Sequence, residues 1–353
     1  MRLITALAPV RICDCGGWTD TWFAGHGQVF HVAVSPCVEV QIAAAPAQAG
    51  QGSVVVHAEN FRERFEPVAG PPWGAHPLID AAVAHVGVPA DMRVEITIYS
   101  DIPAGAGTGT SAAVVVALVA ALRHLGGLPA DPVVVARAAH AVEAKRLGRE
   151  SGIQDQIGAA HGGVNFIEMR AYPEGVVSSV ALQPQTWWSL DARLLLVYLG
   201  QSHDSSEVHR SVIAALQSGP AAHHALGRLR TAAVKARDAA VAGDLAALGS
   251  AMCENTAAQA ALHPDLVGET ARAVIALARA HGAWGWKVNG AGGDGGSLTL
   301  LAGPAASGRR RLIEAIHAAG AGWRVIPTRI SREGVRAWDE AAGDRVDAAE
   351  PVV

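Results

Sequence analysis

The amino-acid sequence predicts an α+β fold, and the order of its expected elements leads to that prediction. Segments rich in β-branched residues dominate the first third of the 353 residues, whereas 205–281 is almost entirely alanine-rich helix. Strands and helices do not alternate regularly, so a doubly wound parallel sheet is not expected. Half of the residues are hydrophobic and 17% are charged, which supplies a sizeable core and argues against disorder.

The N-terminal third is expected to consist mainly of strands. Residues 2–15 predict two strands with a turn at Pro9, and 29–45 predict one or two strands broken at Pro36. A strand pair within 52–68, a helix at 77–87 and a half-buried strand within 91–103 follow.

The middle of the chain is expected to begin with a helix over 111–125. Asp131 and Pro132 start another, because an acidic N-cap followed by proline at the first helical position is a common helix start. This helix should run to about Leu147 and stop at Gly148. A short helix at 152–160 and strands at 161–170 and 176–200 complete this part.

The C-terminal half predicts helices over 205–281, interrupted near 219–220, 243 and 263–264. The expected elements after them are strands at 284–288, 297–301 and 323–329, a glycine cluster at 290–296 and a helix at 307–319. We place a domain boundary near 185–195, which divides the chain into 1–188 and 189–353. The tail from about 341 is expected to fray.

Charge and cysteine content restrict the class of protein. A net charge of −4 gives no electrostatic support for binding nucleic acid or a membrane surface. The four cysteines lack the spacing of a structural zinc site and suit free thiols in a reducing compartment. The longest apolar run, 112–122, is too short to span a bilayer, and no signal-peptide cleavage site follows Met1. We therefore expect a cytoplasmic monomer or homodimer.

Residues 103–113, "PAGAGTGTSAA", carry three alternating glycines between an expected strand and an expected helix. This arrangement presents unpaired backbone N–H groups to an anion, and glycines allow it to approach closely. The hydroxyls of Thr108, Thr110 and Ser111 add donors, and one at the helix start can reach a metal ion between phosphates. The stretch therefore predicts a phosphate site, with a flexible loop capped by Thr110 or Ser111 as the alternative.

Two familiar phosphate motifs do not match this stretch. A P-loop needs a lysine before its final Ser/Thr, and "GTGTSA" has none. The dinucleotide fingerprint requires GxGxxG within a βαβ unit, whereas "GAGTGT" has different spacing and lies outside such a unit.

Three motifs together resemble the GHMP kinase superfamily, which comprises galacto-, homoserine, mevalonate and phosphomevalonate kinases. The glycine stretch is similar to that family's second motif, although Thr108 replaces a leucine and Thr110 a serine. The first motif, "APVRICDCGGWTDT" at 8–21, is similar to those of fucokinases and heptose-phosphate kinases. The third, "KVNGAGGDGGSL" at 287–298, resembles a glycine run in which Asp294 is a departure.

The resemblance implies a two-domain GHMP kinase fold. Its N-terminal, ATP-binding domain would be of the ribosomal protein S5 domain 2-like type, and its C-terminal domain a ferredoxin-like α/β domain. The resemblance also implies ATP and Mg²⁺ as cofactors. The predicted phosphate cradle comprises Pro103, Gly105, Ala106, Gly107, Thr108, Gly109, Thr110 and Ser111.

The resemblance assigns chemistry to four further side chains. It makes Asp155 the catalytic aspartate, pairs Arg11 with it, and gives the Mg²⁺ ion to Ser111 and Glu143. From the residues alone, Glu143 could instead be a solvated helix residue paired with Lys145 or Arg146. Likewise, Asp155 could be an acid stabilised by a helix dipole, and Arg11 a surface residue.

The expected substrate contacts lie in the first and third motifs. A carboxylate that accepts hydrogen bonds from two vicinal hydroxyls beside an aromatic ring is a common device for sugar recognition, and the resemblance gives this role to Asp20. The alternatives are an Asx turn at Asp20 and a core position for Trp18. The predicted substrate-binding residues are Asp20, Trp18, Thr19, Gly17, Gly292 and Gly293. His203 and Asp204 are more readily explained as helix-capping residues than as substrate contacts.

The sequence therefore predicts a kinase that phosphorylates a sugar hydroxyl, with the anomeric hydroxyl of a fucose-, mannose- or heptose-type acceptor preferred. The acceptor could itself carry a phosphate. A regulator that has lost catalysis is disfavoured because Arg11, Ser111, Glu143 and Asp155 are all present. A kinase for a non-sugar alcohol such as mevalonate would be favoured by lysine at position 11.

Overall fold

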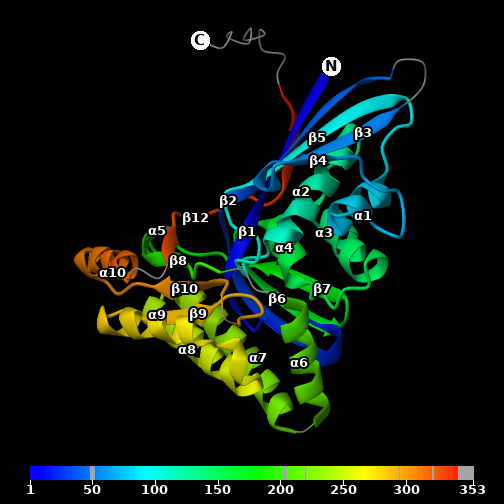
Figure 1. The fold of residues 1–353 in the computed structure, drawn as a ribbon. Coiled ribbons are helices and arrows are strands. Elements are labelled where there is room, and N and C mark those ends of the chain that lie inside the picture. Colours follow the sequence, from blue (N-terminus) through cyan, green and yellow to red (C-terminus); the bar gives the residue numbers. More distant parts are fainter. Residues whose placement is uncertain (48–51, 202–204, 219, 294, 320–321, 341–353) are drawn as a thin grey trace.

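A long, strongly twisted sheet runs down the molecule, with β6 and β7 in its lower half, and a smaller sheet with its helices lies beside that lower half (Figure 1). The computed structural model describes residues 1–47, 52–201, 205–218, 220–293, 295–319 and 322–340. The strands and helices confirm the predicted α+β class.

The larger sheet is organised around its two longest strands. Within the described residues it has nine strands, in the order β13-β1-β2-β5-β3-β4, with β12 and β6 also on β2 and β7 on β6. The strands are β1 (Arg2–Cys15), β2 (Gly27–Pro46), β3 (Ser53–Ala58), β4 (Glu63–Phe65), β5 (Met92–Ser100), β6 (Val164–Ala171), β7 (Glu174–Ser179), β12 (Arg329–Ile330) and β13 (Arg336–Asp339).

The prolines of β1 and β2 do not end their strands, so the predicted turn at Pro9 and break at Pro36 are wrong. The register between the strands shifts from Ala8 opposite Val38 to Val10 opposite Val34. Pro9 and Pro36 both lie in this irregularity, where neither has to donate a ladder hydrogen bond. The bulge therefore lets both strands continue into the region that carries Arg11.

The described helices pack around these strands, and their bounds agree broadly with the sequence-based expectations. α2 and α4 contact β1 and β2, and α7 contacts the same two strands. The helices are α1 (Pro77–Val86), α2 (Thr110–Leu125), α3 (Pro132–Ala141), α4 (Gln154–His161), α5 (Pro184–Arg193), α6 (Ser205–Ser218), α7 (Pro220–Ala242), α8 (Leu245–Leu262), α9 (Glu269–Ala280) and α10 (Ala306–Ala318).

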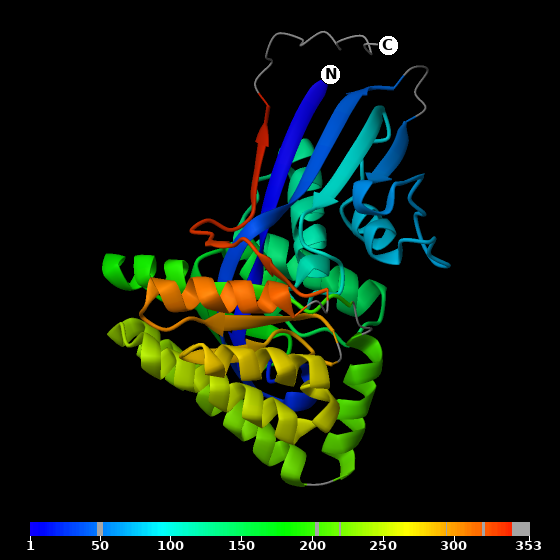
Figure 2. The ribbon, with the colours of Figure 1, turned by 60° about the vertical axis from the view of Figure 1, so that its left-hand side comes forward.

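The smaller sheet is antiparallel and, within the described ranges, has four strands in the order β11-β8-β10-β9. They are β8 (Leu194–Tyr198), β9 (Gly285–Val288), β10 (Ser297–Leu301) and β11 (Arg324–Ile326). This strand order, with helices before β9 and before β11, is the ferredoxin-like arrangement. α9 and α10 share a core cluster with Leu195 and Val197, whereas Leu194 and Leu196 join the core of the larger sheet. Figure 2 shows these two helices, in gold and orange, beside the smaller sheet.

Two elements were not foreseen. Residues 176–200 were expected to be strand, but Pro184 starts α5 inside this range as a first-turn proline. β13 pairs with β1, so the chain returns to the larger sheet after β11. The division at 188/189 stays a prediction. No helix in the described part of the chain has the length and apolar character needed to cross a membrane.

Candidate active site

The glycine stretch forms a tight loop whose backbone requires glycine. Gly105, Gly107 and Gly109 have φ values of 73°, 73° and 71°, in the left-handed region that disfavours other residues. A Cβ at Gly107 would lie 2.8 Å from the carbonyl oxygen of Asn289, and one at Gly109 would lie 3.2 Å from Cγ of Asp155. The loop therefore packs closely against the third motif and against the predicted catalytic aspartate.

Polar side chains join this loop to the third motif. Asn289 donates from Nδ2 to Oγ of Ser297 at 2.9 Å, and Ser297 donates to the carbonyl oxygen of Ala106 at 2.6 Å. Thr299 donates to Oδ1 of Asn289 at 2.7 Å. These side chains are buried, so the bonds hold the loop in a water-poor environment where they are strong.

Arg11 and Asp155 form the ion pair that the sequence predicted, with Nε 2.8 Å from Oδ1. Arg11 also donates to the carbonyl oxygen of Gly107, and its backbone N–H donates to that of Thr108 at 3.0 Å. The arginine is buried, which by itself would lower its pKa, but Asp155, Asp14 and Asp20 outweigh this and raise the pKa. It is therefore a fixed positive charge between β1, the loop and α4.

Asp20 is a buried carboxylate on the turn that follows β1. Its Oδ2 accepts a hydrogen bond from the backbone N–H of Gln154 at 3.0 Å, which ties the turn to the start of α4. Burial raises the pKa of Asp20 to about 6; the Gln154 N–H opposes this shift, and the charge of Asp155 adds to it. The group can therefore change its protonation state near neutral pH.

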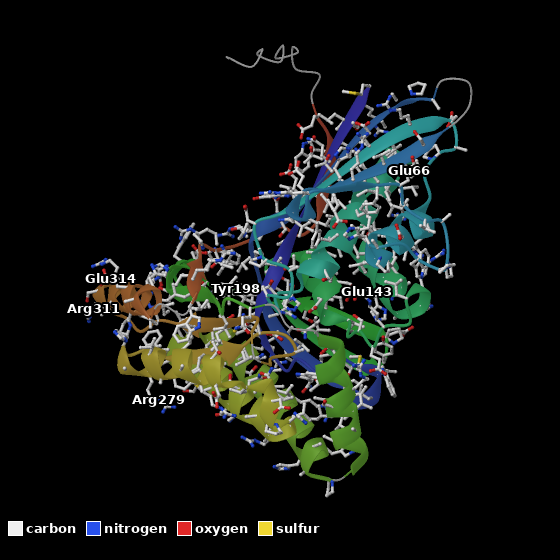
Figure 3. The ribbon with its side chains drawn as sticks, in the orientation of Figure 1. Glu66, Glu143, Tyr198, Arg279, Arg311 and Glu314 are labelled. Atoms are coloured by element: carbon white, nitrogen blue, oxygen red, sulfur yellow. The ribbon has the colours of Figure 1, made fainter. Side chains whose placement is uncertain are left out.

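Glu143 lies on a π-helical turn, Val142–Arg146, that continues α3 (Figure 3). It does not pair with Lys145 or Arg146 as the alternative prediction had it; Oε1 accepts from Nε2 of Gln156 at 3.0 Å. Burial raises the pKa of Glu143, and the nearby charge of Asp155 adds to the shift. A carboxylate held in this way favours a cation beside it.

One cavity of about 510 Å³ brings most of the predicted residues together. Arg11 and Asp155 line it, and so do Asp20 and Glu143. The other predicted residues in its wall are Trp18, Gly105, Ala106, Gly107, Gly109, Thr110 and Ser111.

Several predicted residues lie outside this lining and have structural contacts instead. Thr108 is fully buried, and Thr19 donates from Oγ1 to the carbonyl oxygen of Gly16 at 2.7 Å. Gly292 and Gly293 pack against Leu266, where a Cβ at Gly292 would lie 2.1 Å from the Leu266 carbonyl oxygen. Pro103 and Gly17 are also absent from the wall of the cavity. His203, Asp204 and Asp294 lie outside the described residues.

Sequence reasoning missed a buried ion pair behind the cavity. Lys287 lies 3.2 Å from Oδ1 of Asp14, and both side chains are almost completely buried. Oδ2 of Asp14 accepts from the backbone N–H of Gly290 at 3.1 Å, and Lys287 also donates to Gln259. The signal was present, because both residues lie within motifs, but a lone charge in a motif does not reveal its partner.

Six polar residues in the cavity wall were also missed: Thr21, Arg149, Glu150, Ser151, Gln154 and Arg210. Four of them, from Arg149 to Gln154, lie between Glu143 and Asp155, so their position between two predicted site residues could have indicated them. Arg210 comes from α6, which the sequence does not connect to the first motif.

Comparisons with known proteins identify the same family as the motifs. Residues 77–163 match the model for the GHMP kinases N terminal domain. The chain is 26% identical over 242 residues to the D-glycero-alpha-D-manno-heptose 7-phosphate kinase of Campylobacter jejuni, covering 68% of this chain and 69% of that protein. It is 32% identical over 255 residues to a mevalonate kinase of Thermococcus sibiricus, covering 70% and 69%.

A solved structure shows the same fold. The crystal structure of a D-glycero-D-manno-heptose 1-phosphate kinase from Bacteroides thetaiotaomicron superposes with a TM-score of 0.73 at 19% identity. The superposition covers 96% of this chain and 100% of the other, so the likeness extends over both sheets.

Proposed function

Because this chain belongs to the GHMP kinases, phosphotransferases that act on alcohol groups with ATP as the donor, we propose that it phosphorylates a sugar hydroxyl. The observation that carries the proposal is the Arg11–Asp155 ion pair, which lies against the glycine loop in one cavity with Asp20. The preferred position is the anomeric hydroxyl of a fucose-, mannose- or heptose-type acceptor, with or without a phosphate of its own.

The reaction requires the acceptor oxygen to attack the γ-phosphorus while the bond to the β,γ-bridging oxygen breaks and ADP leaves. The carboxylate of Asp155 would receive the hydroxyl proton. Arg11 cannot shuttle a proton because a guanidinium stays charged, but it stabilises negative charge on the attacking oxygen. Its bonds to Asp155 and to the loop fix both partners before substrate arrives.

The donor's phosphates would lie along the loop 105–111. The backbone amides at the start of α2 face the cavity without side-chain bulk, because the glycines of this loop line it. Ala112 follows in the same wall, so the first helical turn also faces the phosphate tail.

Ser111 and Glu143 provide a donor set that fits Mg²⁺. Within the described ranges no three His, Cys, Asp or Glu side chains could hold a metal together. Mg²⁺ usually takes only one or two protein ligands and completes its shell with water and phosphate oxygens. A carboxylate and a hydroxyl in the wall of one cavity meet that need, and bound Mg²⁺ would neutralise charge on the phosphates.

Asp20 supports a sugar as the acceptor. Its buried carboxylate lies in the cavity wall beside Trp18, an arrangement suited to two vicinal hydroxyls and the apolar face of a ring. The motif around it, 16–21, is the part of the chain that resembles sugar kinases, and Arg11 rather than lysine accompanies it.

A screen of ADP release tests the proposal. Free aldoses, 6- and 7-phosphorylated aldoses and mevalonate are supplied with ATP and Mg²⁺, and NMR of the product locates the new phosphate. We expect turnover with at least one aldose and a kcat roughly 10³-fold lower with Asp155→Asn. Turnover with mevalonate alone would overturn the sugar assignment, and ADP release at an undiminished rate in Asp155→Asn would overturn the assigned mechanism.

A further inference from the structure

The side chain of Gln154 is buried in the cavity wall with an unsatisfied oxygen. Only 6% of the residue is exposed, and Oε1 has no hydrogen-bond partner. A buried polar atom without a partner is costly, and native structures contain few of them. Because this one belongs to a residue that lines the proposed substrate cavity, a ligand can supply the missing bond.

The main chain of Gln154 places this carboxamide beside the acceptor residues. Its backbone N–H donates to Asp20, and the next residue is Asp155. Its Nε2 lies 3.0 Å from the point that a Cβ on Gly17 would occupy. Gly17 therefore contributes to the site by leaving room for the Gln154 side chain, rather than by lining the cavity itself.

Gln156, on the other side of Asp155, shows why the cavity matters. Its Oε1 is also buried without a partner, but its Nε2 donates to Glu143 at 3.0 Å and it does not line the cavity. An unpaired oxygen alone therefore does not mark a binding residue. Gln154 differs because its side chain lines the cavity. Its oxygen is enclosed by protein in this conformation, and a rotation about the broad terminal torsion of glutamine brings it to the space that the acceptor would fill.

We propose that Gln154 determines acceptor specificity by accepting a hydrogen bond from one hydroxyl of the sugar. This hydroxyl would be adjacent to those that donate hydrogen bonds to Asp20. The inference rests on the proposed sugar kinase function. A site built to bond a particular hydroxyl rejects an analogue that lacks it, because the buried oxygen then stays unpaired.

A cycle of enzyme and substrate variants tests this assignment. The probes are D-mannose, L-fucose and their monodeoxy analogues, assayed for kcat/KM and, by calorimetry, for binding to the enzyme. In the unaltered enzyme one deoxy analogue should be at least about tenfold worse than its parent. Gln154→Met, which keeps the volume but removes the acceptor, should abolish that one preference and leave the others intact.

Two further variants complete the cycle. Gln154→Glu keeps an acceptor oxygen and should retain the preference at the same carbon. Gln185→Met, at an exposed glutamine outside the cavity, should behave like the unaltered enzyme. If Gln154→Met keeps every preference, or Gln154→Glu loses the same one, the inference is overturned. If neither probe turns over, the cycle uses the aldose that the ADP-release screen identifies and its deoxy analogues; if no aldose of that screen turns over in the unaltered enzyme, the proposed function fails instead.

Discussion

The two walls of the cavity are built in different ways. The wall of the glycine loop presents mainly backbone. Its glycines have left-handed φ values, and Gly107 and Gly109 lie close to the main chain of Asn289 and to the side chain of Asp155. The opposite wall presents buried side chains, among them Asp20, Gln154 and the Arg11–Asp155 pair. Backbone amides bind phosphate of any nucleotide alike, whereas side chains can distinguish one acceptor from another. Under the proposed function, the first wall would therefore bind the donor and the second would determine specificity.

A buried ion pair and a hydrogen bond outside the cavity connect the two walls. Asp14 on β1 pairs with Lys287 on β9 and accepts from the backbone N–H of Gly290. A Cβ at Gly290 would lie 2.7 Å from the carbonyl oxygen of Gly107, so the third motif rests directly on the loop. The position of the loop therefore depends on charges that do not face the cavity.

The largest expected effect comes from removing the carboxylate of Asp155, in the wall opposite the glycine loop. Asp155→Asn should lower kcat roughly 10³-fold, in the range lost with a general base, while KM for ATP stays close to its starting value. Steady-state ADP release measures both constants. Asp238→Asn, at an exposed residue of α7, is the matched control and should leave kcat unchanged. A kcat preserved in Asp155→Asn would remove the distinction between the walls.

The next effect is on the free energy of unfolding and concerns the Asp14–Lys287 ion pair. Lys287→Met should lower the free energy of unfolding by about 3–5 kcal/mol, because Asp14 would be left as a buried, unpaired charge. Urea denaturation measures this loss. The double variant Asp14→Asn, Lys287→Met should recover part of it, and equal losses in the single and double variants would show that the charge pair does not hold the walls.

A smaller effect is expected where the walls touch. Gly109→Ala puts a Cβ 3.2 Å from Cγ of Asp155 and strains a residue with φ of 71°. We expect kcat to fall about tenfold because the new Cβ displaces the carboxylate. The strained backbone should also lower the free energy of unfolding by about 1–2 kcal/mol. Gly127→Ala is the control, since φ there is 77° but no atom lies within 4 Å of the new Cβ. Equal kcat in both variants would contradict the contact.

The smallest effect is the pH dependence of the acceptor wall. Because the pKa of Asp20 is raised to about 6, kcat/KM for the acceptor should fall about fivefold from pH 6 to pH 5 as the carboxylate is protonated. The raised pKa also means that this group favours the fold most below its unfolded pKa, and that this contribution is lost as pH rises through about 6.

A variant that lacks the Asp20 carboxylate shows whether Asp20 causes this pH dependence. Asp20→Asn should lower kcat/KM near neutral pH and abolish the step near pH 6. In thermal or urea unfolding it should also remove the loss of stability between pH 4 and about 6. A step that persists in Asp20→Asn would assign the titration to another group, such as Glu143, whose pKa is also raised.

Local sequence signals were reliable where one segment decides its own structure. The Asp131 N-cap accepts from the backbone N–H of Val134 at 2.9 Å, as the Asp-Pro pair predicted. Pro9 and Pro36 misled, because each alone signals a break, whereas together they occupy one bulge between paired strands. The helix α5 was missed because its apolar residues also suit a strand.

The sequence by itself determined the α+β class, the kinase family and the glycine loop, because glycine spacing and helix starts act over a few neighbouring residues. Only the tertiary structure revealed that Asp14 meets Lys287 and that Gln154, whose buried side-chain oxygen has no hydrogen-bond partner, lines the cavity. Which side chains are buried, and which of them pair, depends on contacts between residues more than a hundred positions apart along the chain. A local sequence pattern does not specify such contacts.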